Sequence, residues 1–395
     1  MITLTNTQAR QFLLLKHGLL GEYKFQGKQG VLSFVRQAGC IQFDPLDICG
    51  KNAELVCQSR VKGFTKSMLY ELLYTDRKLI DYVDKNLAIM PVEDWPYFER
   101  YREASRRQEE DYPGMRELRA QVCSYIKSSG AVCSGDIRLD GSFFWRSAVH
   151  WSSGHNLSRS VLEQMYSAGE LVIHHKKGTH KYYDIAEKHI PHALLDAPDP
   201  LPDEPDHFAW RVLRRIGAVG LLWNRPSDAW INIWGLNAQQ RNNAFERLLS
   251  EGQIAEAEVE GIKDRLYLRS EDIPIIETVM QSPKLKPRCE LIAPLDNLLW
   301  DRKLINTLFG FDYTWEVYTP VSKRKFGHYV LPLLYGDAFI GRVEAAANQR
   351  TKTLTVKNIW FEQGVRQTKK LQTAIDRCLE RFARFNGCRL YCDER

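Results

Sequence analysis

The sequence lacks the features that mark membrane and secreted proteins. Its 395 residues contain no run of about 18 apolar residues, the length that a membrane-spanning helix needs. The first residues, MITLTNTQARQF, show no basic start followed by an apolar stretch, so no secretory signal is indicated. We therefore expect a cytoplasmic protein that does not bind membranes.

Patterns for metal binding and disulfide frameworks are also missing. None of the nine cysteines forms a CxxC pair, and no pair of histidines has the spacing of a zinc site. An odd number of scattered cysteines is typical of reduced thiols in a reducing compartment. We expect no metal ion and no cofactor.

Length and charge place further limits on the fold and the partner. A chain of 395 residues exceeds what one hydrophobic core usually holds, which indicates two or more domains. The formal net charge is +6, and Lys323, Arg324 and Lys325 are adjacent. A basic cluster of this kind attracts a phosphate backbone, although many proteins without a nucleic-acid partner have a similar overall charge.

One segment, DAPDPLPDEPD at residues 196–206, has the composition of a linker. Four of its eleven residues are proline and five are acidic. Because proline interrupts both helices and central strands, we expect an exposed connector without regular structure.

An internal repeat lies on either side of this connector. Residues 160–191 and 243–274 each contain a short amphipathic helix that ends at a glycine, followed by two short strands around a polar turn. This order is typical of a winged-helix unit, whose last helix and hairpin can contact DNA. The alternative is that such units serve as spacers or protein-contact modules.

The two ends of the chain have different patterns. The N-terminal segment is rich in helix, with helices predicted after Thr5, over 29–38 and over 65–75. After Lys286 the pattern changes to an antiparallel sheet or small barrel, with strands predicted at 291–299, 315–318, 328–334, 339–343 and 353–360. A final helix is predicted over 365–385, and its polar face carries Lys369, Lys370, Arg377 and Arg384.

The segment that follows the second predicted helix holds the residues with potential chemistry. If this segment is extended, Gln42 and Asp44 project from one side and Phe43 projects from the other, towards the core. A carboxylate and an amide side by side can hold one water molecule, with the amide orienting it and the carboxylate accepting its proton or stabilising a cationic sugar. A Gln-x-Asp pattern also occurs often by chance, and a nucleophilic Cys40 or Cys49 is an alternative.

A long series of motifs follows residue 290: LIAPLDNLLWDR (291–302), LFGFDY (308–313), EVYTP (316–320), KRKFGHYVLP (323–332) and GDAFIGR (336–342). Together with the triplet Gln42-Phe43-Asp44, this series resembles the YcaQ/AlkZ-type winged-helix DNA glycosylases, and the resemblance covers nearly the whole chain. That family has a catalytic triplet of Gln, an aromatic or apolar residue, and then Gln or Asp. The resemblance therefore implies that Asp44 and Gln42 are catalytic, in the form that resembles the YcaQ branch.

The resemblance also implies an architecture. The expected fold is α+β, with three tandem winged-helix units followed by a β-barrel-like C-terminal part with a terminal helix, C-shaped overall. The expected segments are 1–110 for winged-helix unit 1 with the catalytic triplet, 111–195 for unit 2, 196–206 for the linker, 207–285 for unit 3, and 286–395 for the barrel-like part and the C-terminal helix.

The implied activity is monofunctional hydrolysis of the N-glycosidic bond of N7-alkylated purines in duplex DNA. It is a base excision step in the repair of alkylation damage, and in the YcaQ branch it includes interstrand crosslinks. An N7-alkylated guanine is already cationic and leaves readily, so one carboxylate and a water-positioning amide can suffice. Bulky lesions favour an open site that acts on a partly displaced nucleotide.

The alternative function is that of a non-enzymatic winged-helix DNA-binding protein or transcriptional regulator. Such a regulator would be a dimer with two half-sites, whereas this chain has three unequal units and no heptad dimerisation helix. We expect a monomer, associated with the nucleoid, whose partner is double-stranded DNA.

The candidate DNA-binding residues are Arg302, Lys323, Arg324, Lys325, Arg342 and Arg350. Arg302 has an alternative interpretation, since Asp301 could pair with it or cap a turn. The family pattern carries an Asp-Arg pair where this chain has Asn348-Gln349, so a specific phosphate contact at this point is in doubt, although Arg350 is adjacent.

Overall fold

The chain folds into two compact units. The computed structural model describes three stretches, residues 1–109, 114–139 and 157–392. Unit 1 contains Met1–Leu69 and Phe208–Arg395, and unit 2 contains Tyr70–His207. This division groups the chain differently from the five predicted segments, whose boundaries stay predictions. Part of the predicted segment 111–195 lies outside the described residues.

The first strand of the chain pairs with a hairpin that is far away in the sequence. In unit 1, β1 (Ile2–Leu4) lies parallel to β10 (Ile254–Val259), which pairs with β11 (Leu266–Arg269), and β11 pairs with β9 (Leu222–Trp223). The helix before this hairpin is α10 (Ala238–Ser250), so the helix and hairpin predicted within 243–274 are confirmed. The pairing of β1 with β10 ties the start of the chain to its C-terminal half.

The N-terminal helices begin and end where the sequence signals them. The helix α1 (Asn6–Lys16) begins after Thr5, whose hydroxyl accepts the backbone N–H of Gln8 while the Gln8 side chain accepts that of Thr5. The helix α2 (Gly27–Ala38) ends at Gly39, which has the positive φ of 74° that glycine adopts most readily. The third predicted helix is α4 (Lys66–Tyr74).

One buried helix escaped the sequence pattern. All nine residues of α3 (Asn52–Arg60) are buried, yet four of them are the strongly polar Asn52, Glu54, Gln58 and Arg60. A hydrophobic periodicity therefore cannot mark this helix. The other strands and α-helices of unit 1 outside the C-terminal sheet are β2 (Phe25–Gln26), β3 (Ile41–Gln42), β4 (Val61–Lys62), α11 (Ile273–Met280), α12 (Arg302–Phe309) and most of α9 (Glu204–Val219), which begins in the last residues of unit 2.

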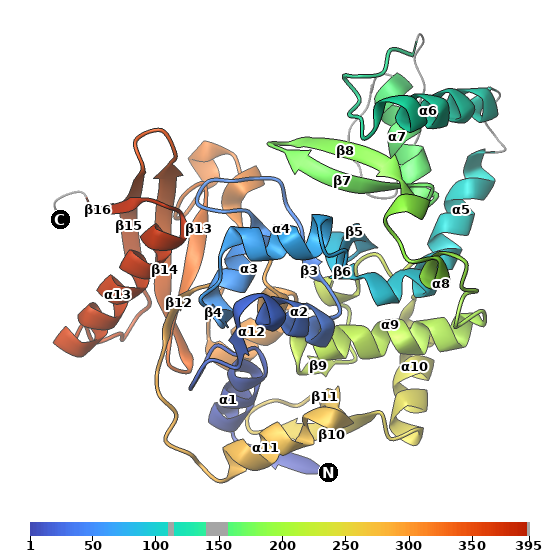
Figure 1. Cartoon of the computed structure of the whole chain (residues 1–395). Coiled ribbons are helices and arrows are strands. Elements are labelled where there is room, and N and C mark those ends of the chain that lie inside the picture. Colours follow the sequence, from blue (N-terminus) through green and yellow to red (C-terminus); the bar gives the residue numbers. More distant parts are fainter. Residues whose placement is uncertain (110–113, 140–156, 393–395) are drawn as a thin grey trace. The chain divides into compact units, whose positions relative to one another are not determined.

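The C-terminal part of unit 1 is an open sheet of five strands, half of a barrel in form (Figure 1). Its strands, in spatial order, are β12 (Cys289–Leu291), β13 (Val330–Tyr335), β14 (Ala338–Asn348), β15 (Thr353–Phe361) and β16 (Arg389–Cys392). Neighbours are antiparallel except for the parallel pair of β15 and β16. The helix α13 (Lys369–Phe385) packs on this sheet and contacts both of its edge strands.

Several predictions about regular structure are wrong. Residues 292–299 leave the sheet, because Pro294 has no N–H to donate and the Asp296 side chain accepts the N–H of Leu298 to form a 3-10 turn, η5 (Asn297–Leu299). Residues 316–318 form another 3-10 turn, η6 (Glu316–Tyr318). The last strand, β16, was not predicted. The linker is exposed over most of its length, but α9 already begins at Glu204 within it, since proline is tolerated in the first turn of a helix.

Unit 2 contains the first copy of the repeat. The predicted helix, glycine and hairpin are present as α7 (Leu157–Ser167), Gly169 with φ 82°, β7 (Leu171–Lys177) and β8 (His180–Ile185). The other elements of the unit are β5 (Leu79–Asp84), β6 (Asn86–Pro91), α5 (Glu99–Glu109), α6 (Met115–Ser129) and α8 (His192–Leu195). No helix in the described stretches combines the length and hydrophobicity that crossing a membrane requires.

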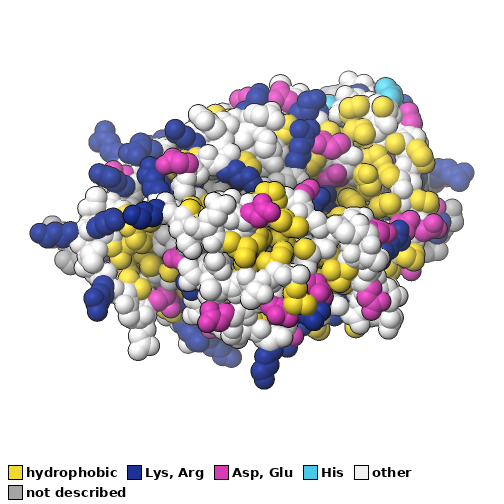
Figure 2. Space-filling view, turned by 90° about the horizontal axis from the view of Figure 1, so that it is seen from below, with side chains coloured by type: hydrophobic (Ala, Val, Ile, Leu, Met, Phe, Trp, Pro, Cys, Tyr) yellow, Lys and Arg dark blue, Asp and Glu magenta, His cyan; other side chains and the backbone are white. Residues whose placement is uncertain are grey.

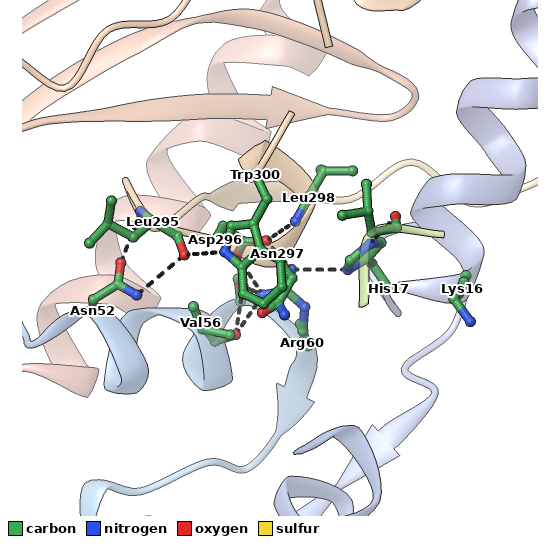
Figure 3. Close-up of polar contacts among 12 residues, drawn as sticks. Lys16, His17, Asn52, Val56, Arg60, Leu295, Asp296, Asn297, Leu298 and Trp300 are labelled. Atoms are coloured by element: carbon green, nitrogen blue, oxygen red, sulfur yellow. Dashed lines mark hydrogen bonds and ion pairs between the residues drawn. The ribbon is translucent and has the colours of Figure 1, made fainter. Parts of the chain in front are cut away.

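A fully buried ion pair joins the N-terminal helices of unit 1 to the segment after β12. The Arg60 guanidinium donates to both Asp296 oxygens, at 2.6 and 2.8 Å, and both side chains have no exposed surface (Figure 3). Arg60 also donates to the Val56 carbonyl at 2.7 Å and lies over the Phe34 ring. Because each charge has lost its water, each depends on the other for compensation.

Removal of one charge of this pair should strongly destabilise the protein. The substitution Asp296→Asn keeps an acceptor for the Leu298 N–H but leaves the Arg60 charge buried without a counterion, and we expect a loss of about 3–5 kcal/mol in the free energy of unfolding. Urea unfolding followed by circular dichroism measures this loss. The control is Asp312→Asn, at an exposed aspartate. Equal midpoints for the two variants would contradict the role of the ion pair.

Candidate active site

Two buried asparagines hold the backbone around Gln42. The side-chain amide of Asn52 donates to the Gln42 carbonyl at 2.8 Å. The Asn52 side-chain oxygen accepts the N–H of Leu295 at 3.0 Å (Figure 3). Asn297 donates to the carbonyl of Cys40 at 2.8 Å. The strand β3 is therefore held at its start and at its end by polar side chains that the sequence analysis did not single out.

The Gln42 side chain is buried and has an unused acceptor. It is 6% exposed, and its Oε1 atom has no hydrogen-bond partner within the described part of the chain. A buried amide oxygen without a partner is costly, so such groups in native proteins normally meet a water molecule or a ligand. The geometry therefore offers one acceptor for the O–H of a bound water.

Asp44 lies in the loop after β3 and is half-buried. Its Oδ1 atom accepts the backbone N–H of Leu46 at 2.9 Å. Partial burial raises the pKa of the Asp44 carboxyl above its ordinary value, and the hydrogen bond from Leu46 opposes this rise. A carboxylate with a raised pKa is a better proton acceptor than an ordinary one.

Aromatic side chains lie near Asp44. Phe43 is half-buried, so the expectation that its ring enters the core is met only in part. Tyr329 is buried, and its pKa is raised well above the ordinary value by burial first and also by the charges of Asp44 and Asp47. Burial likewise raises the pKa of the Cys49 thiol far above neutrality, which disfavours Cys49 as a nucleophile.

Residues 291–302, which we call the clasp, bind the N-terminal helices of unit 1 through hydrogen bonds and an ion pair. The Leu291 carbonyl accepts a hydrogen bond from Gln58 at 3.0 Å, and Asp296 pairs with Arg60. Asp301 caps α12 by accepting the N–H of Leu304 and also accepts the indole N–H of Trp223 at 2.7 Å. Of the alternatives left open for Asp301, the structure thus supports a cap.

The six candidate DNA-binding residues differ in exposure. Lys323, Lys325 and Arg350 are exposed, and Arg324 is half-buried because it donates to the Thr319 carbonyl at 2.8 Å. Arg302 is half-buried with its guanidinium over the Tyr313 ring.

Arg342 lies in a different environment from the other five. It is 5% exposed and pairs with Glu362 at 2.7 Å, and its guanidinium lies between the rings of Phe311 and Phe326. Because these contacts already compensate the charge of Arg342, we do not propose this residue as a DNA contact.

Basic side chains also gather at the C-terminal end of unit 1. Figure 2 shows many Lys and Arg side chains at the left of the view, the side where Figure 1 places α13 and the C-terminal sheet. The four basic residues predicted on the polar face of α13 are all exposed, namely Lys369, Lys370, Arg377 and Arg384.

A group of potential metal ligands lies in unit 2, although the sequence showed no metal spacing. The ligand atoms of His174, Asp184 and His189 lie within 4.8 Å of one another. The Asp184 carboxylate already accepts hydrogen bonds from Lys188 and His189, both at 2.9 Å, and the charge of Arg77 is close to both histidines. Gln42 and Asp44 belong to unit 1, and the chemistry that we propose for them uses no metal.

Comparison with known proteins agrees with this fold. Residues 35–385 match the family described as DNA glycosylase AlkZ-like. The structure is similar to that of the Streptomyces sahachiroi DNA glycosylase AlkZ, with a TM-score of 0.61 at 14% sequence identity, over 99% of this chain and 100% of that chain. The family match covers most of the sequence and includes both Gln42 and Asp44. The chain therefore belongs to the AlkZ-like DNA glycosylase family.

Proposed function

We propose that this protein hydrolyses the N-glycosidic bond of N7-alkylated purines in duplex DNA, including purines joined in interstrand crosslinks. The observation that carries the proposal is the pair formed by the unpartnered Gln42 Oε1 and the Asp44 carboxyl with its raised pKa. Membership in a DNA glycosylase family supplies the reaction class. The half-exposed position of Asp44 fits an open site better than a sealed pocket.

In the proposed reaction, Gln42 and Asp44 share one water molecule. The water donates one hydrogen bond to Gln42 Oε1 and one to the Asp44 carboxylate. These two hydrogen bonds direct a lone pair of the water oxygen at the sugar C1′ atom. As the C1′–N9 bond breaks, its electron pair neutralises the positive charge of the alkylated purine. The carboxylate stabilises the cationic sugar and accepts the proton as the water adds. No protein nucleophile is needed, which makes the enzyme monofunctional.

The rest of the chain serves to hold the duplex. We propose that the two helix–hairpin segments and the N-terminal helices are three winged-helix units that contact DNA, and that a monomer suffices for one lesion. The rival function is that of a non-enzymatic DNA-binding regulator, which would not need a water molecule bound at the buried Gln42 acceptor. The two functions differ in whether a base is released.

The substitution Asp44→Asn should abolish base release and leave the fold intact. We expect a fall of about a hundredfold or more in the single-turnover rate on a duplex with one N7-methylguanine, because the proton acceptor is lost. Asparagine keeps an acceptor for the Leu46 N–H and removes a partly desolvated charge, so the thermal midpoint should not fall.

The matched control for this experiment is Asp47→Asn, in the same loop. Asp47 is exposed, and an asparagine there can still accept the N–H of Gly50. We expect the rate of this variant to stay near that of the wild type. Tight, salt-sensitive binding by the wild type without any base release would favour the regulator instead.

The pH dependence of base release should show the raised pKa of Asp44. The carboxyl must be ionised to accept a proton, so the rate should fall with decreasing pH around a midpoint above about 3.9, the ordinary value for aspartate. Single-turnover rates measured from about pH 8 downwards give this midpoint. The Asp47→Asn variant should keep the same acid limb, and a midpoint at or below the ordinary value would contradict the assignment.

The exposed lysines of the 323–325 cluster should bind phosphates of the duplex. In the double variant Lys323→Gln and Lys325→Gln, the slope of log K against log salt concentration should become smaller by about 0.9 for each phosphate that the protein no longer neutralises. Fluorescence anisotropy with an undamaged duplex measures the slope. The control is Lys284→Gln, at an exposed lysine between α11 and β12. An unchanged slope in the double variant would remove the cluster from the interface.

A further inference from the structure

Two large apolar side chains project from the loop Trp315–Gly327, which we call the Tyr318 loop. Tyr318 is 82% exposed and Val321 is 77% exposed, more than any other large hydrophobic side chain in the described stretches. Their exposure leaves apolar surface in water, so it indicates a partner that covers them. Residues Lys323 and Lys325 of the same loop are exposed as well, so the partner carries negative charge close to an apolar surface.

The loop is held in one conformation by its own polar contacts. The buried Glu316 carboxylate accepts the backbone N–H groups of Lys325, Phe326 and Gly327 at 2.7, 2.9 and 3.2 Å. Burial alone would raise the pKa of Glu316, but these three donors hold it below its ordinary value, so the carboxylate is ionised at neutral pH. The Arg324 side chain makes a further contact within the loop by donating a hydrogen bond to the Thr319 carbonyl. Because the loop is already ordered, a partner that binds Tyr318 and Val321 would cost it little backbone entropy.

The base of the loop packs on Tyr329, a buried side chain near Asp44. The Trp315 ring packs edge-on against Tyr318, with ring centroids 5.7 Å apart, and also against the buried Tyr329 at 6.1 Å. The Asp44 carboxylate is close enough to both tyrosines to help raise the pKa of each hydroxyl, after the larger effect of burial. The exposed ring of Tyr318 thus lies near Asp44, and the Trp315 ring connects it to the buried Tyr329.

We propose that Tyr318, supported by Val321, is a stacking site for a DNA base at the lesion, and that its ring covers the base face exposed when the alkylated nucleotide is displaced from the helix. This inference rests on the proposed function for the location of the lesion. A base has a flat apolar face within a polyanionic backbone, which matches an aromatic ring flanked by lysines. Stacking by Tyr318 would stabilise the displaced state that Asp44 needs in order to reach the sugar.

The test compares Tyr318→Ala with Tyr318→Phe in the full-length protein, with Tyr391→Ala as a control at another exposed tyrosine. The first readout is the fluorescence of 2-aminopurine placed next to N7-methylguanine, which rises when the base stack opens on binding. The second readout is the single-turnover rate of base release. For Tyr318→Ala we expect loss of the fluorescence rise and a rate lower by about tenfold or more, since stacking of one base contributes about this much. The Phe variant and the Tyr391→Ala control should behave like the wild type.

The outcomes separate this inference from the proposed function. If Tyr318→Ala retains both the fluorescence rise and the rate, the stacking site is wrong while the glycosylase stands. If Tyr318→Phe is as impaired as Tyr318→Ala, the hydroxyl acts rather than the ring, and the stacking proposal is wrong. If the wild type releases no base but shows a fluorescence rise that only Tyr318→Ala loses, the stacking site holds and the proposed reaction fails. Because Tyr318 is exposed, none of these substitutions should disturb the fold.

Discussion

The buried ion pair of Arg60 and Asp296 is the interaction on which unit 1 depends. It joins residues 236 positions apart, and the desolvation of both charges is offset by their paired hydrogen bonds, the Val56 carbonyl and the Phe34 ring. His17 completes the arrangement. Burial lowers the pKa of this histidine to about 3, so the neutral ring donates to the Val219 carbonyl and can accept from Arg60. A protonated His17 would place a second positive charge against the guanidinium.

The buried polar groups of unit 1 differ in how fully the protein satisfies their hydrogen bonds. Asn52 and the Glu316 carboxylate, which shapes the Tyr318 loop, have their hydrogen bonds made by the protein itself. Gln42 keeps a buried oxygen without a partner, and Asp44 carries a charge that burial makes less favourable. A buried acceptor without a partner and a partly desolvated charge each cost stability. The ion pair and hydrogen bonds of the clasp at residues 291–302 stabilise the segment around them. Gln42 therefore lies on backbone that these contacts hold in place.

The sequence predicted the regular elements with strong local signals and missed those set by distant contacts. The cap at Thr5, the glycine ends of α2 and α7, and the hairpins of both repeats follow from local chemistry. The helix α3 was not predicted because its buried face is polar and its partners come from the C-terminal half. Gln42 and Asp44 could be named from a short motif, but the role of Asn52 could not, since its partner Leu295 is 243 positions away. Tyr318 was not singled out because residues 315–318 were predicted to form a strand.

The pairing of β1 with β10 and the clasp at residues 291–302 together set an order of events during synthesis. Until the ribosome has passed Asp296, a nascent chain that carries Gln42 and Asp44 lacks both the partner of Arg60 and the Leu295 N–H that the Asn52 side chain accepts. Unit 2, which is continuous in sequence, is complete long before that point. The polar side chains of α3 must therefore stay in contact with water until most of the chain has been synthesised. A polypeptide released early would carry both candidate catalytic residues without the structure that positions them.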